Sequence, residues 1–486
     1  MNYRELTIDE LHELLVSKKV TPLDLAKEAI ALAKADTNNA FEYIMEKEAL
    51  EAAAALGEPE ANNPLWGIPF VIKDNFSTKG VPTTGSSNIL NGYVPVFDAT
   101  VVEKLKAAKA IAIGKTTLDE LAMGGSGITG HLGRTYNPWD RSHSRIVGGS
   151  SCGSAAAIAD GFVPFGLGSD TGDSTRKPAS HAGLIGFKPT WSRISRFGLF
   201  PFAPSLDTVG IFSRNVKDCA YVLNVLAGRD DKDSTSSTRP VEDYTKDLDK
   251  ENKNYKIAVI KEIEDSISNK VIKDAFKKSV EDLKKAGYQV DYVSVSNDLL
   301  LTLFPTYFVI SCAEATSNNA NMDGIKFGPL SEGKTFEEVM LNARTKGFGE
   351  LIKRRFVIGS FALMKENQQE LFVRAQKNRR RIVDTINDIL KEYNFIYLPA
   401  APSVAPKFDD ASDRLSDEYL IADNHLCIAN FAGLPSLTLP IGFEDEMPFG
   451  ANITGRAFDD KDVLKISYEI EKLTGYKNLV AKGGQK

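Results

Sequence analysis

Two stretches built mostly from small residues lie close together in this chain, GGSSCGSAAAIADG at 148–161 and GSDTGDSTRKPAS at 168–180. Small side chains let a backbone turn tightly and approach its neighbours, and glycine permits this best. The first stretch resembles a glycine turn entering a helix, which would present N–H groups and the positive end of a helix dipole. A close-packed turn with Ser150 as a helix cap fits the same residues. The GxxxxGK[ST] pattern of a phosphate cradle does not occur there.

The second stretch carries a serine, Ser174, four residues before Pro178. Gly172 supplies backbone freedom, and the proline favours a helix that begins nearby. Successive N–H groups in such a turn can converge on one point, as they do in an oxyanion hole. A surface turn would have the same composition. The candidate oxyanion-hole donors are the N–H groups of Thr171, Gly172, Asp173 and Ser174.

A nucleophilic serine needs a base, which is usually histidine or lysine. No GxSxG elbow surrounds Ser174, but His143 and His181 are near the small-residue stretches and keep a histidine triad possible. The other candidate is Lys73, which ends the apolar run IPFVI at 68–72. Burial there would favour a neutral lysine that can act as a base. A lysine that simply reaches solvent at a strand end is the alternative.

Short apolar runs alternate with helical patterns along the chain, which predicts an α/β fold. We expect a central mixed, mainly parallel β-sheet covered by helices on both faces. The predicted strands include 68–72, 111–115 and 255–260. Thr7 to Glu10 has the form of a capping box, and Thr21 precedes a proline at the first position of a second helix.

The predicted organisation is a helical lead-in at 1–60 and a single large domain at 61–486. Residues 229–254 are polar and charged, which predicts an exposed connection. A helical region is expected at about 299–392.

Composition excludes several classes of protein. The formal net charge is −6, so no basic face for binding nucleic acid directly is expected. The four cysteines are far apart and form no CxxC pair, which argues against a zinc site and fits a reducing cytoplasm. The N-terminus lacks the pattern of a signal peptide, and the apolar stretch at 299–313 is too short to span a bilayer. We expect no metal or cofactor in this chain.

Lys73 after an apolar strand, GGSS at 148–151 and GSDTGDSTR at 168–176 together resemble the amidase signature family, whose block has the form GGSSGGS…GSDTGGSIR. The resemblance extends over most of the chain. It implies the amidase-signature fold and a Ser–Ser–Lys triad. Ser174 would be the nucleophile, Ser150 the relay in a cis peptide arrangement, and Lys73 the ultimate base.

The chain departs from the family block at Cys152, Asp173, Thr175 and Lys177, where the family usually has Gly, Gly, Ile and Gln. Backbone N–H donors survive such changes. Asp173 matters most, because a non-glycine residue resists unusual dihedral angles and a carboxylate opposes an oxyanion. We expect Lys177 or Arg176 to pair with Asp173, which would make this a coordinated local variant.

Stretches 313–328, 344–363 and 430–442 resemble one branch of the family, the A subunits of glutamyl-tRNA(Gln) amidotransferases. This resemblance implies hydrolysis of glutamine through a glutamyl ester, with the ammonia used to convert Glu-tRNA(Gln) to Gln-tRNA(Gln). It also implies a heterotrimer with a tRNA-binding B subunit, which uses ATP and Mg²⁺, and a small C subunit.

For glutamine itself, the resemblance implies that Arg355 binds the α-carboxylate and Asp423 the α-ammonium, with Tyr307 lining the pocket. A surface basic cluster around Arg355 and a helix cap at Asp423 are the structural alternatives. Two other functions stay open: a stand-alone amidase acting on small aliphatic or aryl amides, and a catalytically silent scaffold subunit suggested by Asp173.

Overall fold

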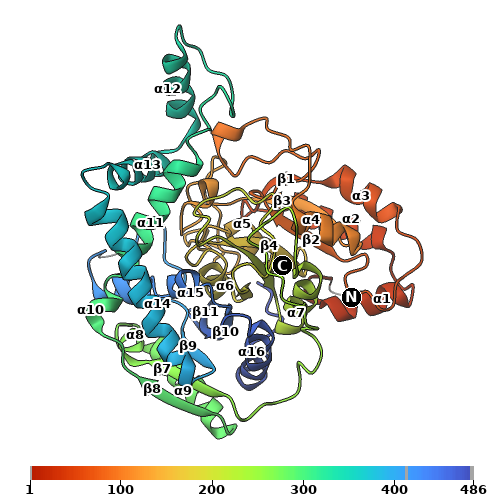
Figure 1. The fold of residues 1–486 in the computed structure, drawn as a ribbon. Helices are drawn as coiled ribbons and strands as arrows, with labels where there is room; N and C mark the ends of the chain where they lie inside the picture. Colours follow the sequence, from red (N-terminus) through yellow and green to blue (C-terminus); the bar gives the residue numbers. More distant parts are fainter. Residues whose placement is uncertain (1–2, 411–413, 482–486) are drawn as a thin grey trace.

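An eleven-stranded mixed sheet forms the centre of the computed structural model, which describes residues 3–410 and 414–481. Helices flank the sheet on both sides (Figure 1). The order of its strands is β1-β3-β2-β4-β6-β5-β10-β11-β9-β7-β8. The strands are β1 (Phe41–Ile44), β2 (Pro69–Lys73), β3 (Ile111–Thr116), β4 (Phe165–Asp170), β5 (Ile185–Lys188), β6 (Thr208–Ser213), β7 (Lys256–Ile260), β8 (Gln289–Val293), β9 (Phe395–Pro399), β10 (Ser436–Glu444) and β11 (Met447–Gly455).

The α-helices are α1 (Ile8–Val16), α2 (Pro22–Lys34), α3 (Glu46–Ala54), α4 (Thr100–Ala107), α5 (Cys152–Ala159), α6 (Arg176–Ala182), α7 (Val216–Leu226), α8 (Lys261–Asp265), α9 (Lys270–Lys285), α10 (Asn297–Leu300), α11 (Leu303–Asn318), α12 (Phe336–Gly347), α13 (Glu350–Leu363), α14 (Arg374–Glu392), α15 (Cys427–Ala432) and α16 (Asp460–Thr474). Single 3₁₀ or π turns are η1 (Tyr3–Glu5), η2 (Asn88–Leu90), η3 (Glu120–Ala122), η4 (Gln369–Val373) and η5 (Glu418–Ala422).

The predicted mixed α/β sheet is confirmed. Its parallel neighbours fall into two groups, in which β2 pairs with β3 and β4, and β7 pairs with β8 and β9. The strands between these groups, from β4 through β6, β5, β10 and β11 to β9, pair antiparallel. The alternation of apolar and helical segments therefore predicts the class of the fold, while strand direction depends on which distant strands meet.

The first two helices begin as the sequence predicts. Thr7 and Thr21 each accept a hydrogen bond from the N–H three residues on, and the acid at that position bonds back to the threonine N–H. These capping boxes satisfy N–H groups that a helix start would otherwise leave free. One strand, β1, interrupts the region predicted to be a helical lead-in, and it joins the sheet antiparallel to β3.

Residues 229–254 contain no described helix or strand, and most of their side chains are exposed. Ser236, Tyr244 and Leu248 are buried, and the Tyr244 hydroxyl accepts a hydrogen bond from Arg193 Nε at 2.5 Å. This aromatic side chain holds the segment against the main body.

The region 299–392 is helical but consists of several separate elements. The sequence predicts that the stretch at 299–313 is too short to span a bilayer, but the helix pair α10–α11 that contains it, at Asn297–Asn318, is long and apolar enough to cross a membrane by length and composition alone. It packs against α13 and α14 within the protein, and Ile310, Cys312 and Ala315 are buried there. The helix α12 projects away from the main body (Figure 1).

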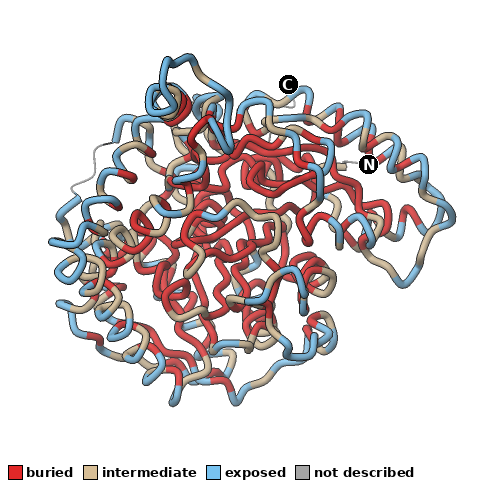
Figure 2. Tube along the Cα trace, turned by 45° about the horizontal axis from the view of Figure 1, so that its top comes forward, coloured by how far each residue is buried: buried red, intermediate tan, exposed pale blue. Residues whose placement is uncertain are grey.

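Buried residues gather in the interior of the chain trace, and exposed residues follow its periphery (Figure 2). One apolar cluster joins the sheet to α1, α7, α9 and α16. A second joins α11, α13, α14 and α15, and a third surrounds α5 and α2. Packing on both faces keeps the middle strands away from water. The candidate site begins in this buried region, at the end of β2.

Helices α11 and α13 come very close at Gly359. A Cβ atom at this position would lie 2.1 Å from the main-chain oxygen of Cys312 and 2.2 Å from Thr316 Oγ1. The two helices carry Tyr307 and Arg355, so this contact sets how those side chains face each other.

We therefore expect Gly359→Ala to force α11 and α13 apart. Overpacking typically costs about 1–3 kcal/mol, which exceeds the gain of roughly 1 kcal/mol from replacing a helical glycine. The urea midpoint of unfolding should fall. Gly57→Ala is the matched control, because no atom lies within 4 Å of a Cβ there. Equal midpoints for the two variants would contradict this account of the helix contact.

Candidate active site

Lys73 ends β2 and its side chain is completely buried. Its Nζ lies within hydrogen-bond distance of three serine hydroxyls, Ser150 Oγ at 2.8 Å, Ser151 Oγ at 2.8 Å and Ser169 Oγ at 2.9 Å. Asn75 Nδ2 donates to the same Ser169 Oγ at 2.9 Å. The lysine therefore does not reach solvent at the strand end, and it is surrounded by neutral hydroxyl groups.

This environment favours an uncharged amine. Burial lowers the pKa of Lys73 from its ordinary value to about 7, against the opposing effect of Cys152, Asp119, Asp170 and Asp207. No carboxylate within the described residues forms an ion pair with its Nζ. A lysine of this kind exchanges its proton near neutral pH, which suits it to act as a base.

Ser150 reaches Lys73 because the turn before α5 brings its side chain inward. The Gly149–Ser150 peptide bond is cis, and Gly148 has a φ of 87°. The N-cap of α5 is Ser151, without a side-chain capping bond. The alternative in which Ser150 caps this helix is therefore wrong, because its hydroxyl bonds to the lysine instead.

Ser174 lies in the turn between β4 and α6 and is only 3% exposed. Its main-chain oxygen accepts a hydrogen bond from Ser151 N at 3.2 Å, so the two small-residue stretches meet beside Lys73. The structure thus brings together the three residues predicted for the triad. The helix predicted near Pro178 starts at Arg176.

Four successive N–H groups of this turn, those of Thr171, Gly172, Asp173 and Ser174, donate no hydrogen bond to any described part of the chain. Buried N–H groups almost always have a partner, so a run of free donors beside a buried serine is unusual. The Thr171 hydroxyl donates to Asp207 Oδ1 at 2.7 Å, which anchors the start of the turn. The free donors are suited to receive negative charge.

Arg176 and Asp170 hold the two ends of this turn together. Arg176 Nη2 lies 2.9 Å from Asp170 Oδ1, and its Nε donates to Asp170 Oδ2 at 3.1 Å. The guanidinium also donates to Gly172 O at 2.8 Å and to Asn430 Oδ1 at 2.7 Å. Both partners of the pair are fully buried. This network fixes the main chain on either side of Ser174.

The sequence predicts that either Lys177 or Arg176 pairs with Asp173. In the structure Asp173 pairs with Lys177, while Arg176 pairs with Asp170. The distance from Lys177 Nζ to Asp173 Oδ2 is 2.8 Å, and Asp423 Oδ1 lies 3.2 Å from the same nitrogen. The backbone of Asp173 does not adopt a positive φ, so the expected conflict with its dihedral angles does not arise. Asp423 directly follows η5 as its C-cap, and its N–H donates to Glu418 O at 2.9 Å.

Tyr307 and Arg355 come to the same turn from α11 and α13. A Cβ at Gly172 would lie 2.8 Å from the Tyr307 ring, so that ring rests directly on the turn. Burial raises the pKa of Tyr307, Arg355 lowers it and Asp173 raises it, which places its hydroxyl within electrostatic range of both charges. Nε and Nη1 of Arg355 are buried and have no hydrogen-bond partner in the portion that the structure describes.

Neither of the two histidines considered as a base forms a hydrogen bond to Ser174 in the described structure. His143 stacks on Tyr136 with ring centroids 4.8 Å apart. His181 is buried within α6, and burial lowers its pKa to about 3. The arrangement therefore favours the lysine alternative over a histidine triad.

Residues that the sequence reasoning missed complete the site. Ser151 and Ser169 supply two of the three hydroxyls around Lys73, and Asp170 and Asn430 hold Arg176. Ser169 and Asp170 end β4 immediately before the predicted oxyanion turn, which was a signal available in the sequence. Asn430 carries no such signal, because it lies 254 residues from Arg176.

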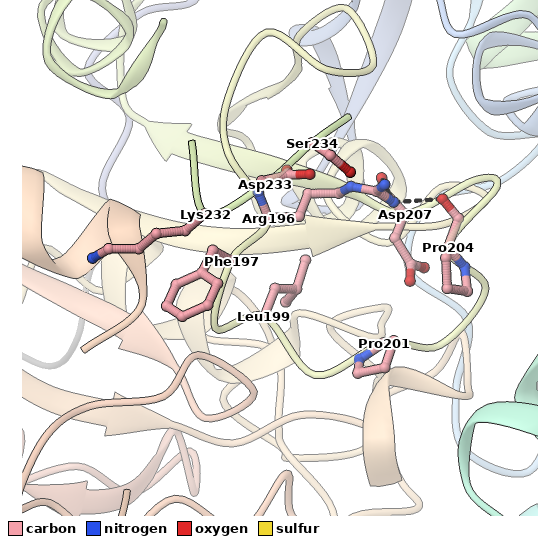
Figure 3. A pocket seen from close by; sticks show the side chains of 9 residues that line it. All are labelled: Arg196, Phe197, Leu199, Pro201, Pro204, Asp207, Lys232, Asp233 and Ser234. Atoms are coloured by element: carbon pink, nitrogen blue, oxygen red, sulfur yellow. Dashed lines mark hydrogen bonds between the residues drawn. The ribbon is translucent and has the colours of Figure 1, made fainter. Parts of the chain in front are cut away.

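A surface pocket of about 240 Å³ opens beside Asp207 (Figure 3). Arg196, Phe197 and Leu199 line the pocket. Asp207 lines it too, and its Oδ1 accepts the hydrogen bond from the Thr171 hydroxyl. It contains none of the predicted site residues. Across the described ranges, no cluster of three or more His, Cys, Asp or Glu side chains could hold a metal ion.

Comparison with known proteins gives a consistent result. The family model described as Amidase matches residues 24–464. The glutamyl-tRNA(Gln) amidotransferase A subunit of Latilactobacillus sakei is 42% identical over the whole of both chains, and that of Streptococcus uberis is 40% identical over the same span. The crystal structure of the protein of that name from Thermotoga maritima aligns with a TM-score of 0.80 and 36% identity, over 97% of this chain and 95% of that one.

We expect Arg176→Met to destabilise the protein strongly, because it leaves the buried Asp170 carboxylate without its cation. Breaking a buried ion pair typically costs about 3–5 kcal/mol in the free energy of unfolding. Urea unfolding at neutral pH measures the loss. Arg380→Met, in the exposed pair of Arg380 with Asp384, is the control and should change stability by less than about 1 kcal/mol. Similar midpoints for both variants would contradict the role given to Arg176.

Proposed function

This chain belongs to the amidase family, and from that premise we propose that it is the glutamine-hydrolysing A subunit of a glutamyl-tRNA(Gln) amidotransferase. The observation that carries the proposal is the buried Lys73 with Ser150 Oγ at 2.8 Å, next to the turn that holds Ser174. Full-length relatives with that name, at 40–42% identity, support the choice of substrate.

In the proposed mechanism, neutral Lys73 takes a proton from Ser150 while Ser150 takes the proton of Ser174. Ser174 Oγ attacks the side-chain amide carbon of glutamine and forms a tetrahedral intermediate. The C–N bond then breaks, and the stored proton passes back through Ser150 to the leaving ammonia. The γ-glutamyl ester on Ser174 is hydrolysed by water, which regenerates the serine.

The oxyanion of that intermediate needs donors that are already in place. The free N–H groups from Thr171 to Ser174 supply them, and the Arg176–Asp170 network keeps them from rearranging. Preorganised donors of this kind contribute about 3–4 kcal/mol each to lowering the barrier. The side chain of Asp173 does not remove its own N–H from this set.

Glutamine brings an α-carboxylate and an α-ammonium to the site. Arg355, whose buried Nε and Nη1 lack a hydrogen-bond partner among the described residues, is suited to the carboxylate. Asp423, whose side chain is 32% exposed, is suited to the ammonium. The Tyr307 ring rests on Gly172 and would line the pocket. A surface role for Arg355 fits less well, because two of its guanidinium nitrogens, Nε and Nη1, are buried.

The ammonia would serve a second subunit that binds tRNA and uses ATP and Mg²⁺, with a small third subunit completing a heterotrimer. This chain would contact tRNA mainly through that partner, in keeping with its formal net charge of −6. We expect the complex to work in the cytoplasm, where its tRNA substrate is found.

Ammonia release from glutamine tests the proposal. We expect turnover by the chain together with the proteins that co-purify with it from its own cells, and a loss of at least about a thousandfold in Ser174→Ala. Ser205→Ala, a serine outside the proposed triad, is the matched control. Broad turnover of simple aliphatic or aryl amides by the lone chain would instead indicate a stand-alone amidase. A complex without any amide hydrolysis would indicate a silent scaffold.

The pH dependence tests the base. Because Lys73 must be neutral and burial lowers its pKa to about 7, kcat/KM for glutamine should rise as the pH increases through about 7 and then level off. The rate below that pH should fall about tenfold per unit. Circular dichroism across the range checks that the protein stays folded. A profile that is flat from about pH 6 to about pH 8 would contradict a lysine base.

A further inference from the structure

Lys177, in the first turn of α6, lies between two carboxylates beside the proposed active site. Its Nζ is 2.8 Å from Asp173 Oδ2 and 3.2 Å from Asp423 Oδ1, and it donates to the main-chain oxygen of Asp423 at 2.6 Å. The lysine side chain is only 9% exposed. One ammonium group therefore joins the turn that carries Ser174 to the end of η5, 246 residues further along the chain.

The two carboxylates do not share this cation equally. Asp173 has the shorter contact to Nζ, while Asp423 keeps a side chain that is 32% exposed. Asp423 Oδ2 makes no hydrogen bond to any described residue. With two carboxylates and one ammonium, the cluster carries one net negative charge, and the more exposed of its two carboxylates is that of Asp423, at 32% against 19% for Asp173.

We propose that Asp173 is a specificity-determining residue, which engages Lys177 so that Asp423 keeps a free negative charge for the ammonium group of an amino-acid substrate. The proposal rests on the proposed function, because it needs glutamine as the substrate. The Asp173 carboxylate has no part in the chemical step and acts through Lys177 and Asp423, while the N–H of the same residue stays among the proposed oxyanion donors.

The charges around the site agree with this division. Without Asp173, Lys177 and Asp423 would neutralise each other and nothing would be left for an ammonium group. With Asp173 present, the cluster is anionic, and Arg355 supplies the complementary cation near Tyr307. A site with one net charge of each sign suits a zwitterion better than a neutral amide.

Lys177 is needed for a different reason. Asp173 is the neighbour of Ser174 and belongs to the turn whose N–H groups would hold the oxyanion. An unpaired carboxylate at that place would oppose the developing negative charge. The two residues therefore depend on each other. Asp173 prevents Lys177 from neutralising Asp423, and Lys177 prevents the Asp173 carboxylate from opposing the oxyanion.

The test compares two substrates on the purified complex. Glutaramate, which is glutamine without its α-ammonium group, presents the same side-chain amide and carboxylate. Asp173→Asn should lower kcat/KM for glutamine by about tenfold to a hundredfold, the effect of losing one charged hydrogen bond, mainly through KM. In the same variant, kcat/KM for glutaramate should change by less than about threefold, because glutaramate has no ammonium group for Asp423 to bind.

The double variant separates specificity from folding. Combining Asp173→Asn with Lys177→Gln leaves the Asp423 carboxylate without a neutralising cation. In this double variant, kcat/KM for glutamine should therefore return to within about threefold of the wild-type value. Lys177→Gln alone should lower kcat for both substrates, because Asp173 is then unpaired. Asp274→Asn in the exposed Lys270–Asp274 pair is the control and should change neither substrate.

Equal losses for glutamine and glutaramate in Asp173→Asn would overturn the proposal, since that pattern means a structural role. Failure of the double variant to recover glutamine turnover while its thermal midpoint stays normal would overturn it too. If the wild-type complex hydrolyses glutaramate but not glutamine, the proposed function fails first, and the two failures are thereby distinguished.

Discussion

The site depends on a lysine that is buried without a carboxylate partner. Removing an ammonium group from water costs free energy. A buried lysine usually offsets this cost by forming an ion pair, or avoids it by releasing its proton. Lys73 has three serine hydroxyls around its Nζ and no ion-pair partner among the described residues, and burial lowers its pKa to about 7, so it can exchange its proton near neutral pH. An ion pair at this position would hold the proton and remove the base.

Several elements packed around β2 keep water away from the Lys73 amine. β2 supplies Lys73, β4 ends at Ser169 and Asp170, and the helices α5 and α6 close over them with small side chains. Glycine and alanine let the two turns meet, so that Ser151 N reaches Ser174 O. A second buried lysine, Lys115, pairs with Asp74 at 3.0 Å. Lys188 is also fully buried without an ion pair among the described residues: its Nζ donates to Pro189 O at 2.9 Å, and burial lowers its pKa to about 7. What distinguishes Lys73 is its contact with Ser150 Oγ, beside the turn that carries Ser174.

Much of this could be predicted from the sequence, because local chemistry carried it. The capping boxes at Thr7 and Thr21 and the strand before Lys73 follow from nearby residues. The meeting of the two small-residue stretches is expected only from the resemblance to the amidase signature family. The antiparallel middle of the sheet could not be predicted, because strand direction depends on distant pairing. The bond between Lys177 and Asp423 is of the same kind, since 246 residues separate the two.

The most direct test of the account is to trap the acyl-enzyme. The complex would be mixed with glutamine, quenched in acid after a short interval, digested and analysed by mass spectrometry. A γ-glutamyl group in ester linkage on Ser174, absent when Lys73 is replaced by alanine, is the predicted result. A γ-glutamyl group on a cysteine such as Cys152, or glutamine turnover without any adduct on Ser174, would contradict a serine nucleophile activated by a buried lysine.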